Sequence, residues 1–574
     1  MRKSFKPTKL AAALVAAIAG GSLATPASAN VSLTTDGFGD AGIMQYYTVA
    51  GDTDSGNWQT MFRLFNNSAD AVAVKVRFRE GLESREVLDF VVWLSPFDAW
   101  SAWTTINASG EGAAVPGIRS RDMSCTTPHP RQGPQSETFG WVDNEVNGTR
   151  YAEFKLSSFA SGDSEAARAA STRIREGHFE VIGMASFGPN TAVYQQSLHQ
   201  EVGGNMQPLG CQSLDRFAFG EPVGNIAGDL AAAEDVGNVL ATNAFIVRLS
   251  TGQGAAYEPV MLGNFATGDD QAEYMLEQQL AHPQLPDLDS GDTDSYYLNV
   301  DDQVALTDDW ADWNISTGTA TDKRLTGLRD FYNSGVVPAR VRGGVDAVSA
   351  TLQRTAVVNE WTRRPVTDSA YLRSIFTQWV LTFPTMHYYT DDTATAGVVA
   401  SPFADPTLAI NTAPFPPFDG SASVGTDPEI PQNYTLTLWN AEEEGVTWTS
   451  PIPGEIDPMV REVNVINFGE PTDGNMMLGL YGDDQIQVEE NQLPENPKYE
   501  PAGNPNADMG WAKLQFYGVN WSQELVGENW TYYGLPVTGF GFTLYQTEGG
   551  NQGNAAIGYS HKYERDYEQT TTTP

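Results

Sequence analysis

The residues that could do chemistry in this chain are mainly carboxylates, and one short segment places several of them close together. These are Asp287, Asp289, Asp292 and Asp294. Closely spaced carboxylates suit Ca²⁺, a hard cation that takes about six to eight oxygen ligands. The segment lacks the order of an EF-hand loop, which has Gly at its sixth position and Glu at its twelfth. The pattern predicts a calcium-binding loop, and the alternative is a solvated acidic loop.

The two cysteines, Cys125 and Cys211, are the next reactive groups. In an exported protein an even pair of cysteines most simply forms one disulfide bond. The alternative is a cysteine nucleophile with His129 as its base, but no cysteine-hydrolase signature surrounds either residue. We therefore predict a Cys125–Cys211 disulfide.

Three cations alternate with apolar residues in a single segment: Lys75, Arg77 and Arg79. This period of two is typical of a β-strand with one buried face. The cations could form an anion-binding strip. The simpler prediction is cross-strand pairing with the carboxylates that follow, namely Glu80, Glu83, Glu86 and Asp89.

Motifs for the common catalytic chemistries are missing from the chain. There is no His-Glu-x-x-His, no Gly-x-Ser-x-Gly and no Gly-x4-Gly-Lys sequence. A Gly-x-Gly-x-x-Gly match at 37–42 precedes a strand-like segment, whereas a dinucleotide site needs a helix there. A glycosidase pair depends on carboxylate separation in space. No catalytic or cofactor-binding residue is therefore assigned.

The N-terminus has the pattern of a secretory signal peptide over residues 1–29. Four cations precede a short apolar run at 10–20, and Ala27-Ser28-Ala29 has the small residues expected before a cleavage site. A membrane-spanning helix needs about 20 apolar residues, and this apolar run is shorter. No second long apolar run follows. We expect a secreted protein, extracellular or on the cell surface, with the periplasm as the alternative and no integral membrane segment after signal removal.

The charge balance limits the partners. The chain has 33 Lys and Arg against 72 Asp and Glu, a formal net charge of −39 at pH 7. Nucleic-acid binding relies on cations that neutralise phosphates, and anionic lipid attracts basic segments. This composition argues against both partners.

The apolar periodicity predicts a mainly β fold, with antiparallel β-sandwich units and a few short helices between them. Segments 58–65, 71–79 and 87–96 read as a three-stranded meander. Hairpins are expected at Asn147-Gly148 and between the segments 244–249 and 257–265, around 252–254. The best helices are expected at 322–332 and 346–361.

Changes in composition suggest the domain organisation. After the signal peptide at 1–29, we expect an N-terminal β-sandwich-like domain over 30–265. An acidic loop and helical connecting segment would span 266–365, and a C-terminal β-rich domain 366–574.

Several blocks of the sequence resemble a family of secreted proteobacterial proteins, described as hypothetical or cell-surface proteins, with no established activity. The blocks are 39–49, 72–96, 378–384 and 534–540. The resemblance implies export and a shared β architecture, and it transfers no functional residue.

Together these features favour an exported, non-enzymatic cell-surface or extracellular-matrix protein with acidic loops that bind calcium. The alternative is a secreted polysaccharide-acting hydrolase or carbohydrate-binding protein. A matrix or surface protein would bind a cell-surface partner, and a hydrolase or carbohydrate-binding protein would bind a polysaccharide. Large aromatics such as Phe97, Trp100 and Trp103 are assigned to the core, with stacking on sugar rings as the alternative. The oligomeric state is not predicted.

Overall fold

The structure is a computed structural model. It describes most of residues 31–266, short pieces between 271 and 320, and most of 344–571 apart from gaps that include 365–373, 390–416, 419–430, 469–485 and 495–507. The predicted signal peptide and the predicted helix at 322–332 lie outside the described residues.

The N-terminal half builds a fifteen-stranded sheet. Its main path runs in the order β8 (Cys125–Thr127), β5 (Glu86–Leu94), β4 (Ala71–Glu80), β12 (Glu176–Phe187), β2 (Ala41–Ala50), β3 (Trp58–Asn66), β6 (Ala99–Thr105), β7 (Gly117–Ser120), β11 (Thr149–Glu153), β10 (Val142–Asn144) and β9 (Arg131–Gln132). Joined off this path are β1 (Ser32–Leu33), β15 (Leu240–Arg248), β16 (Gln253–Tyr257) and β17 (Val260–Gly263).

The C-terminal half builds a ten-stranded sheet. Its order is β24 (Gly445–Thr449), β23 (Tyr434–Asn440), β27 (Asp508–Phe516), β21 (Ala356–Arg364), β22 (Ser374–Thr382), β25 (Val463–Phe468) and β26 (Ile486–Val488), with β31 (Thr538–Gln546), β32 (Ala555–Ser560) and β33 (Lys562–Glu564) off the path.

Small sheets and short helices complete the described part. The small sheets pair β13 (His199–Val202) with β14 (Asn205–Pro208), β18 (Trp313–Asn314) with β19 (Thr319–Ala320), β20 (Gln353–Arg354) with β30 (Leu535–Pro536), and β28 (Trp521–Leu525) with β29 (Glu528–Tyr532) and β34 (Tyr567–Thr571). The helices are α3 (Ala192–Ser197), α4 (Cys211–Ala218), α5 (Ile226–Leu230), α8 (Gly344–Leu352) and the 3₁₀ turns η1 (Arg173–Arg175) and η5 (Met386–Tyr389).

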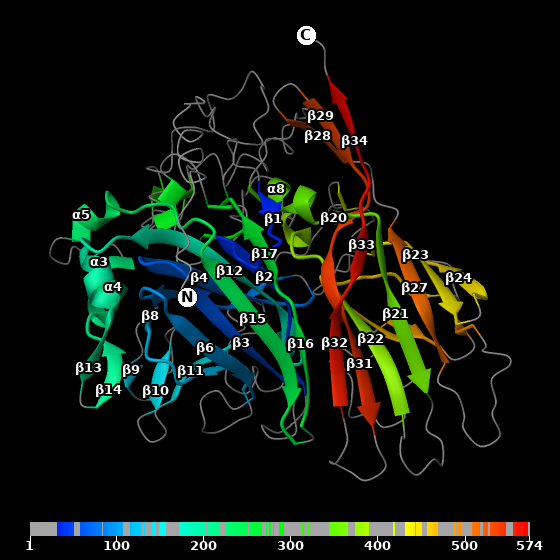
Figure 1. Cartoon of the computed structure of the whole chain (residues 1–574), viewed down its shortest axis with the longest axis horizontal. Coiled ribbons are helices and arrows are strands. Elements are labelled where there is room, and N and C mark those ends of the chain that lie inside the picture. Colours follow the sequence, from blue (N-terminus) through cyan, green and yellow to red (C-terminus); the bar gives the residue numbers. More distant parts are fainter. Residues whose placement is uncertain are drawn as a thin grey trace, which may run out of the picture.

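The two large sheets lie side by side and share a core (Figure 1). The Tyr257 ring stacks on Phe540 with centroids 4.6 Å apart, and Trp58 meets Phe542 edge to face at 5.5 Å. Burial of such large apolar side chains is the main force that holds the layers together. The predicted mainly β fold, with β-sandwich-like units and a few short helices, is confirmed. The described strand pairs are antiparallel except for β9 with β10 and β25 with β26, which are parallel.

The predicted meander is wrong in its first connection. Strand β4 lies between β5 and β12, whereas β3 pairs with β2, β6 and β15. The cause lies at the turn that was expected to close a hairpin. The Asn66 side-chain amide donates to the carbonyls of Asp70 at 2.8 Å and Ser95 at 3.0 Å, so it fixes the connection without strand pairing.

Strand β4 also differs from the expectation of one buried face, because all ten of its residues are buried. Val72, Val74, Val76 and Phe78 belong to the largest apolar core, where the Phe78 ring packs against Phe62 of β3 and Phe179 of β12. The opposite face, with the three cations, is covered by other segments of the chain.

The predicted helix at 346–361 is half right. Helix α8 ends at Leu352, and strand β21 begins at Ala356. β-Branched and aromatic residues such as Val357, Val358 and Trp361 favour a strand, and β27 pairs with β21 from Ala356 to Arg363. The hairpin at Asn147-Gly148 is confirmed, because Asn144 pairs with Thr149. The second hairpin is right in its first strand and wrong in the other: β15 turns back into β16, whereas β17, in the segment expected to pair with it, pairs with β1 and β2.

Candidate functional site

A group of buried, paired ionic side chains lies on one face of β4. Lys75, Arg77 and Arg79 alternate on this face and are 1%, 1% and 4% exposed. Charged groups are almost never buried this deeply unless they are paired. We define the buried charge cluster as these cations and the groups that contact them: Glu86, Asp89, Glu180, Gln279, Asp287 and Tyr388.

Each cation of the cluster meets a carboxylate. Lys75 Nζ contacts Asp89 Oδ2. Arg77 donates from Nε and Nη2 to Glu86 Oε2 at 3.1 and 2.7 Å. Cross-strand pairing of the β4 cations with these two carboxylates, the simpler of the two predictions, is confirmed.

The other two carboxylates of that prediction do not join the cluster. Glu80 accepts from Arg173 Nε at 3.0 Å and from the backbone amides of Leu82 and Arg85, so it stabilises the end of β4. Glu83 lies outside the described residues.

A β-bulge explains why Glu86 and Asp89 face the same side. Residues three apart on a regular strand point to opposite faces. In β5, however, Leu88 is paired with Phe78 and Glu86 with Arg79, so Val87 is an extra residue. The bulge shifts the phase of the strand and brings both carboxylates to the cations.

Strand β12 and two distant segments complete the cluster. Arg79 Nε donates to Glu180 Oε1 at 2.6 Å, and Arg77 Nη1 lies 3.5 Å from Asp287 Oδ2. The Tyr388 hydroxyl accepts from Arg79 Nη2 and from the Leu288 amide, both at 3.2 Å. Segments near 287 and 388 therefore cover β4 with polar contacts.

Burial dominates the electrostatics of the cluster. Burial lowers the pKa of Lys75 below its ordinary 10.5, although Asp89 and Glu86 oppose the shift. Burial, with the nearby Asp89 carboxylate, raises the pKa of Glu86 to about 7. The pKa of His178, which is also fully buried, falls to about 3 through burial and the charge of Arg79. Both His178 and Glu86 thus favour their neutral forms more than the free side chains do.

The predicted calcium ligands are only partly within the described residues. The Asp287 side chain is buried, beside Arg77 and hydrogen-bonded to Ser290. The other three, Asp289, Asp292 and Asp294, lie outside the described residues. Within the described part, no three His, Cys, Asp or Glu side chains are arranged to hold a metal ion. Calcium binding stays a prediction.

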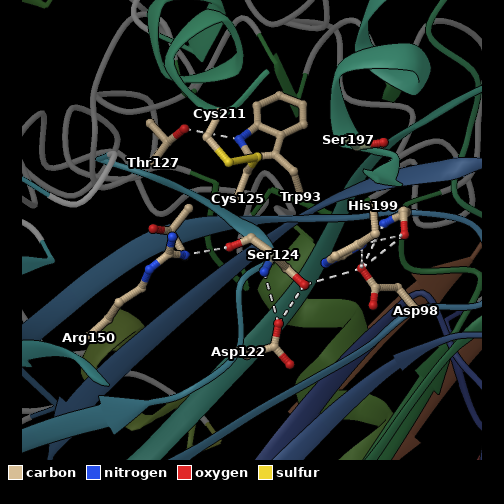
Figure 2. The surroundings of a disulfide bond; sticks show 12 residues. Trp93, Asp98, Asp122, Ser124, Cys125, Thr127, Arg150, Ser197, His199 and Cys211 are labelled. Carbon is tan, nitrogen blue, oxygen red and sulfur yellow. Dashed lines mark hydrogen bonds and ion pairs between the residues drawn. A yellow bond between two sulfur atoms is a disulfide. The ribbon is translucent and has the colours of Figure 1, made fainter. Parts of the chain in front are cut away.

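The predicted disulfide is present between Cys125 in β8 and Cys211 in α4 (Figure 2). It joins residues 86 apart in sequence and ties an edge strand to a helix. Nearby, Trp93 Nε1 donates to Thr127 Oγ1 at 3.0 Å. Because both sulfurs are consumed in the bond, the alternative of a cysteine nucleophile is excluded in this state; its proposed base, His129, lies outside the described residues.

Asp98 and His199 lie near the disulfide (Figure 2), and with Ser95 they form a Ser, His and Asp group that was not predicted. Ser95 Oγ is 3.2 Å from His199 Nδ1, and Asp98 Oδ2 is 3.8 Å from the same nitrogen. A catalytic triad needs the serine and the carboxylate on opposite ring nitrogens. Here Ser95 also donates to Asp98 at 3.2 Å, so the group serves to hold the turn after β5.

Sequence reasoning missed the parts of the cluster that come from far along the chain. The signal for Glu180 was present, because Glu176, His178 and Glu180 occupy alternate positions of a strand whose other residues are mostly apolar. Such polar residues within a buried strand require partners. For Tyr388 and Gln279 no local pattern indicated a role.

Comparison with family models, with curated proteins and with solved structures finds no match for this chain. Within the described residues, no helix is long and apolar enough to cross a membrane.

Proposed function

We propose that the protein is an exported, non-enzymatic cell-surface or extracellular-matrix component. The observation that carries this proposal is the internal pairing of the buried charge cluster. Its cations are paired with carboxylates below the surface, where they stabilise contacts between segments and are not accessible to an external substrate. The disulfide supports export, because such bonds persist in oxidising compartments.

The leader-like N-terminus and the resemblance to secreted proteobacterial proteins support the same location. Cell fractionation with an antibody against the chain tests it. We expect the protein outside the inner membrane, with a mature N-terminus near Asn30. Recovery from the cytoplasm with the leader intact would contradict the proposal.

Calcium binding by the acidic segment is the finer part of the proposal. A chelator should lower the melting temperature, and added Ca²⁺ should restore it, because a cation that binds only the folded state stabilises it. A variant with Asp292→Asn and Asp294→Asn should lose this response. Identical melting curves with and without chelator would remove the calcium claim.

Carbohydrate binding is a second candidate, favoured by an aromatic pair on the C-terminal sheet. Trp511 is 52% exposed and lies opposite Trp439 on β23 and Glu360 on β21. A Cβ on Gly445 would lie 2.9 Å from the Trp439 indole, so glycine leaves room for this ring beside β24. Indole faces with adjacent polar groups suit a neutral sugar ring.

Affinity electrophoresis in gels that contain neutral polysaccharides tests this candidate. Retardation that is lost in Trp511→Ala but kept in Ile557→Ala, a comparably exposed apolar position, would support it. Equal mobility in gels with and without polysaccharide would contradict it. Of the three aromatics assigned to the core, Trp100 is buried as expected and Trp103 is half-buried. The assignment is wrong for Phe97, which is 69% exposed.

A further inference from the structure

Lys75 and Asp89 meet in the buried charge cluster with an amine directly against a carboxyl group. They lie on neighbouring antiparallel strands, β4 and β5, on the face that the β-bulge creates. Their side chains are 1% and 9% exposed. Lys75 Nζ also donates to Gln279 Oε1 at 3.0 Å, which fixes the direction of the amine.

We propose that Lys75 and Asp89 condense into an intramolecular amide bond between Nζ and Cγ, with release of one water molecule. This inference goes beyond the proposed function and does not depend on it, since the reaction needs only the folded chain. It makes the protein its own substrate and gives β4 and β5 a covalent link.

The bond changes balance without an added reagent. One proton passes from the Lys75 ammonium to the Asp89 carboxylate, which leaves an amine and a carboxylic acid. The amine lone pair attacks Cγ, and a second proton passes from nitrogen to the hydroxyl that leaves. The C–O bond then breaks and the N–C bond remains. Oxygen and two protons depart as water, and the two opposite charges disappear together.

Burial favours this reaction over a lasting ion pair. In water both ions are strongly solvated, whereas here the desolvation cost opposes keeping them charged. A neutral amide removes that cost. The same burial lowers the pKa of Lys75, which makes the nucleophilic amine more accessible near neutral pH.

Glu86 is placed to carry the second proton. It interacts electrostatically with both Lys75 and Asp89, and burial raises its pKa to about 7, so the carboxyl group can hold and release a proton at neutral pH. Arg77 donates to Glu86 Oε2 from two nitrogens. The bulge in β5 puts Glu86 on the same face of the strand as Asp89, beside the reacting pair.

Intact-protein mass spectrometry of the wild-type, disulfide-reduced mature chain tests the bond directly. We expect a mass lower than that of the sequence by one water molecule. A trypsin digest should then contain residues 64–77 joined to residues 86–119, because a modified Lys75 is not cleaved. The full sequence mass would overturn the proposal. Loss of water without the joined peptides would also overturn it, since cyclisation of an aspartate elsewhere gives the same mass.

Variants separate the roles of the residues. Lys75→Arg keeps a cation but offers a poor nucleophile, so it should show the full sequence mass; loss of water in this variant would contradict the assignment of Nζ. Glu86→Gln should form the bond at least tenfold more slowly, with a weaker dependence of the rate on pH. Formation at the wild-type rate would overturn the role of Glu86.

These outcomes are distinguishable from failure of the proposed function. A chain that carries the joined peptides but stays in the cytoplasm would contradict export and leave the amide bond standing. An exported chain with the full sequence mass would contradict the amide bond and leave the proposed export standing.

Discussion

Neutralising Glu180 is the sharpest test of the view that the buried charge cluster holds the fold together. Its carboxylate is fully buried, 2.6 Å from Arg79 Nε and 3.8 Å from Arg77 Nη1. Glu180→Gln keeps the size of the side chain and removes its charge. Two guanidinium groups would then be buried with one counterion fewer.

The expected cost follows from the geometry. Opposite unit charges about 4 Å apart attract by about 4 kcal/mol at an effective dielectric constant of about 20. Removal of one partner from a buried pair typically destabilises a protein by about 3–5 kcal/mol. We therefore expect Glu180→Gln to lower the free energy of unfolding by about 3–5 kcal/mol.

The assay is guanidinium denaturation followed by tryptophan fluorescence, with the shift of the transition midpoint as the readout. The matched control is Lys513→Met, which removes a 2.7 Å ion pair with Glu564 whose side chains are 25% and 52% exposed. Solvent-exposed pairs are worth about 0–1 kcal/mol, so this variant should differ little from wild type.

Equal shifts in the two variants would refute the reasoning, because burial would then make no difference to the value of a pair. A double variant, Arg79→Met with Glu180→Leu, gives a second reading. Removal of both charges leaves no unpaired buried charge at this pair, so the double variant should be more stable than Glu180→Gln.

Three further outcomes are expected. Gly177→Ala should lower the melting temperature, because a Cβ there would lie 1.9 Å from the Arg79 carbonyl oxygen. The control is Gly228→Ala in helix α5, where a Cβ would have nothing within 4 Å; this variant should be neutral or stabilising in the same thermal melt. Replacing Cys125 and Cys211 by Ser should cost up to about 4–5 kcal/mol, the chain-entropy value for so long a loop, and a melt of the wild type in reductant should match it. The pKa of His178 is about 3 in the folded protein and 6.5 in the unfolded chain, so between these values only the unfolded chain takes up a proton. The wild type should therefore lose stability as the pH falls from 6.5 to 4, and His178→Leu should lose less of it, as measured by denaturation at each pH.

The sequence predicted the features that depend on local pattern. Alternating Val72, Val74 and Val76 indicated a strand, Asn147-Gly148 indicated a hairpin, and an isolated pair of cysteines indicated a disulfide. These features were predictable because the periodicity of a strand, the backbone demands of a tight turn and the chemistry of thiols act over a few residues.

The features that sequence could not predict depend on contacts between distant segments. Strand β4 pairs with β12, which lies about one hundred residues later in the sequence. No turn motif between the two strands could therefore indicate that they pair. The segment after Leu352 reads as amphipathic helix or as strand, and its pairing with β27 decides for strand. Tyr388 reaches Arg79 only because the chain after β22 returns to the N-terminal sheet.

The bulge in β5 and the buried charge cluster together fix one register for the strands around β4. A slip of β5 by one residue would turn its side chains to the opposite face. Glu86 and Asp89 would then lie among the apolar side chains between the sheets, and Lys75 and Arg77 would lose their partners. Apolar residues such as Val74 and Val76 pack against many neighbours and tolerate such a shift far better than a buried charge does. The cations of β4 therefore discriminate between registers that the valines alone would leave close in energy, and a covalent Lys75–Asp89 bond would make that choice permanent.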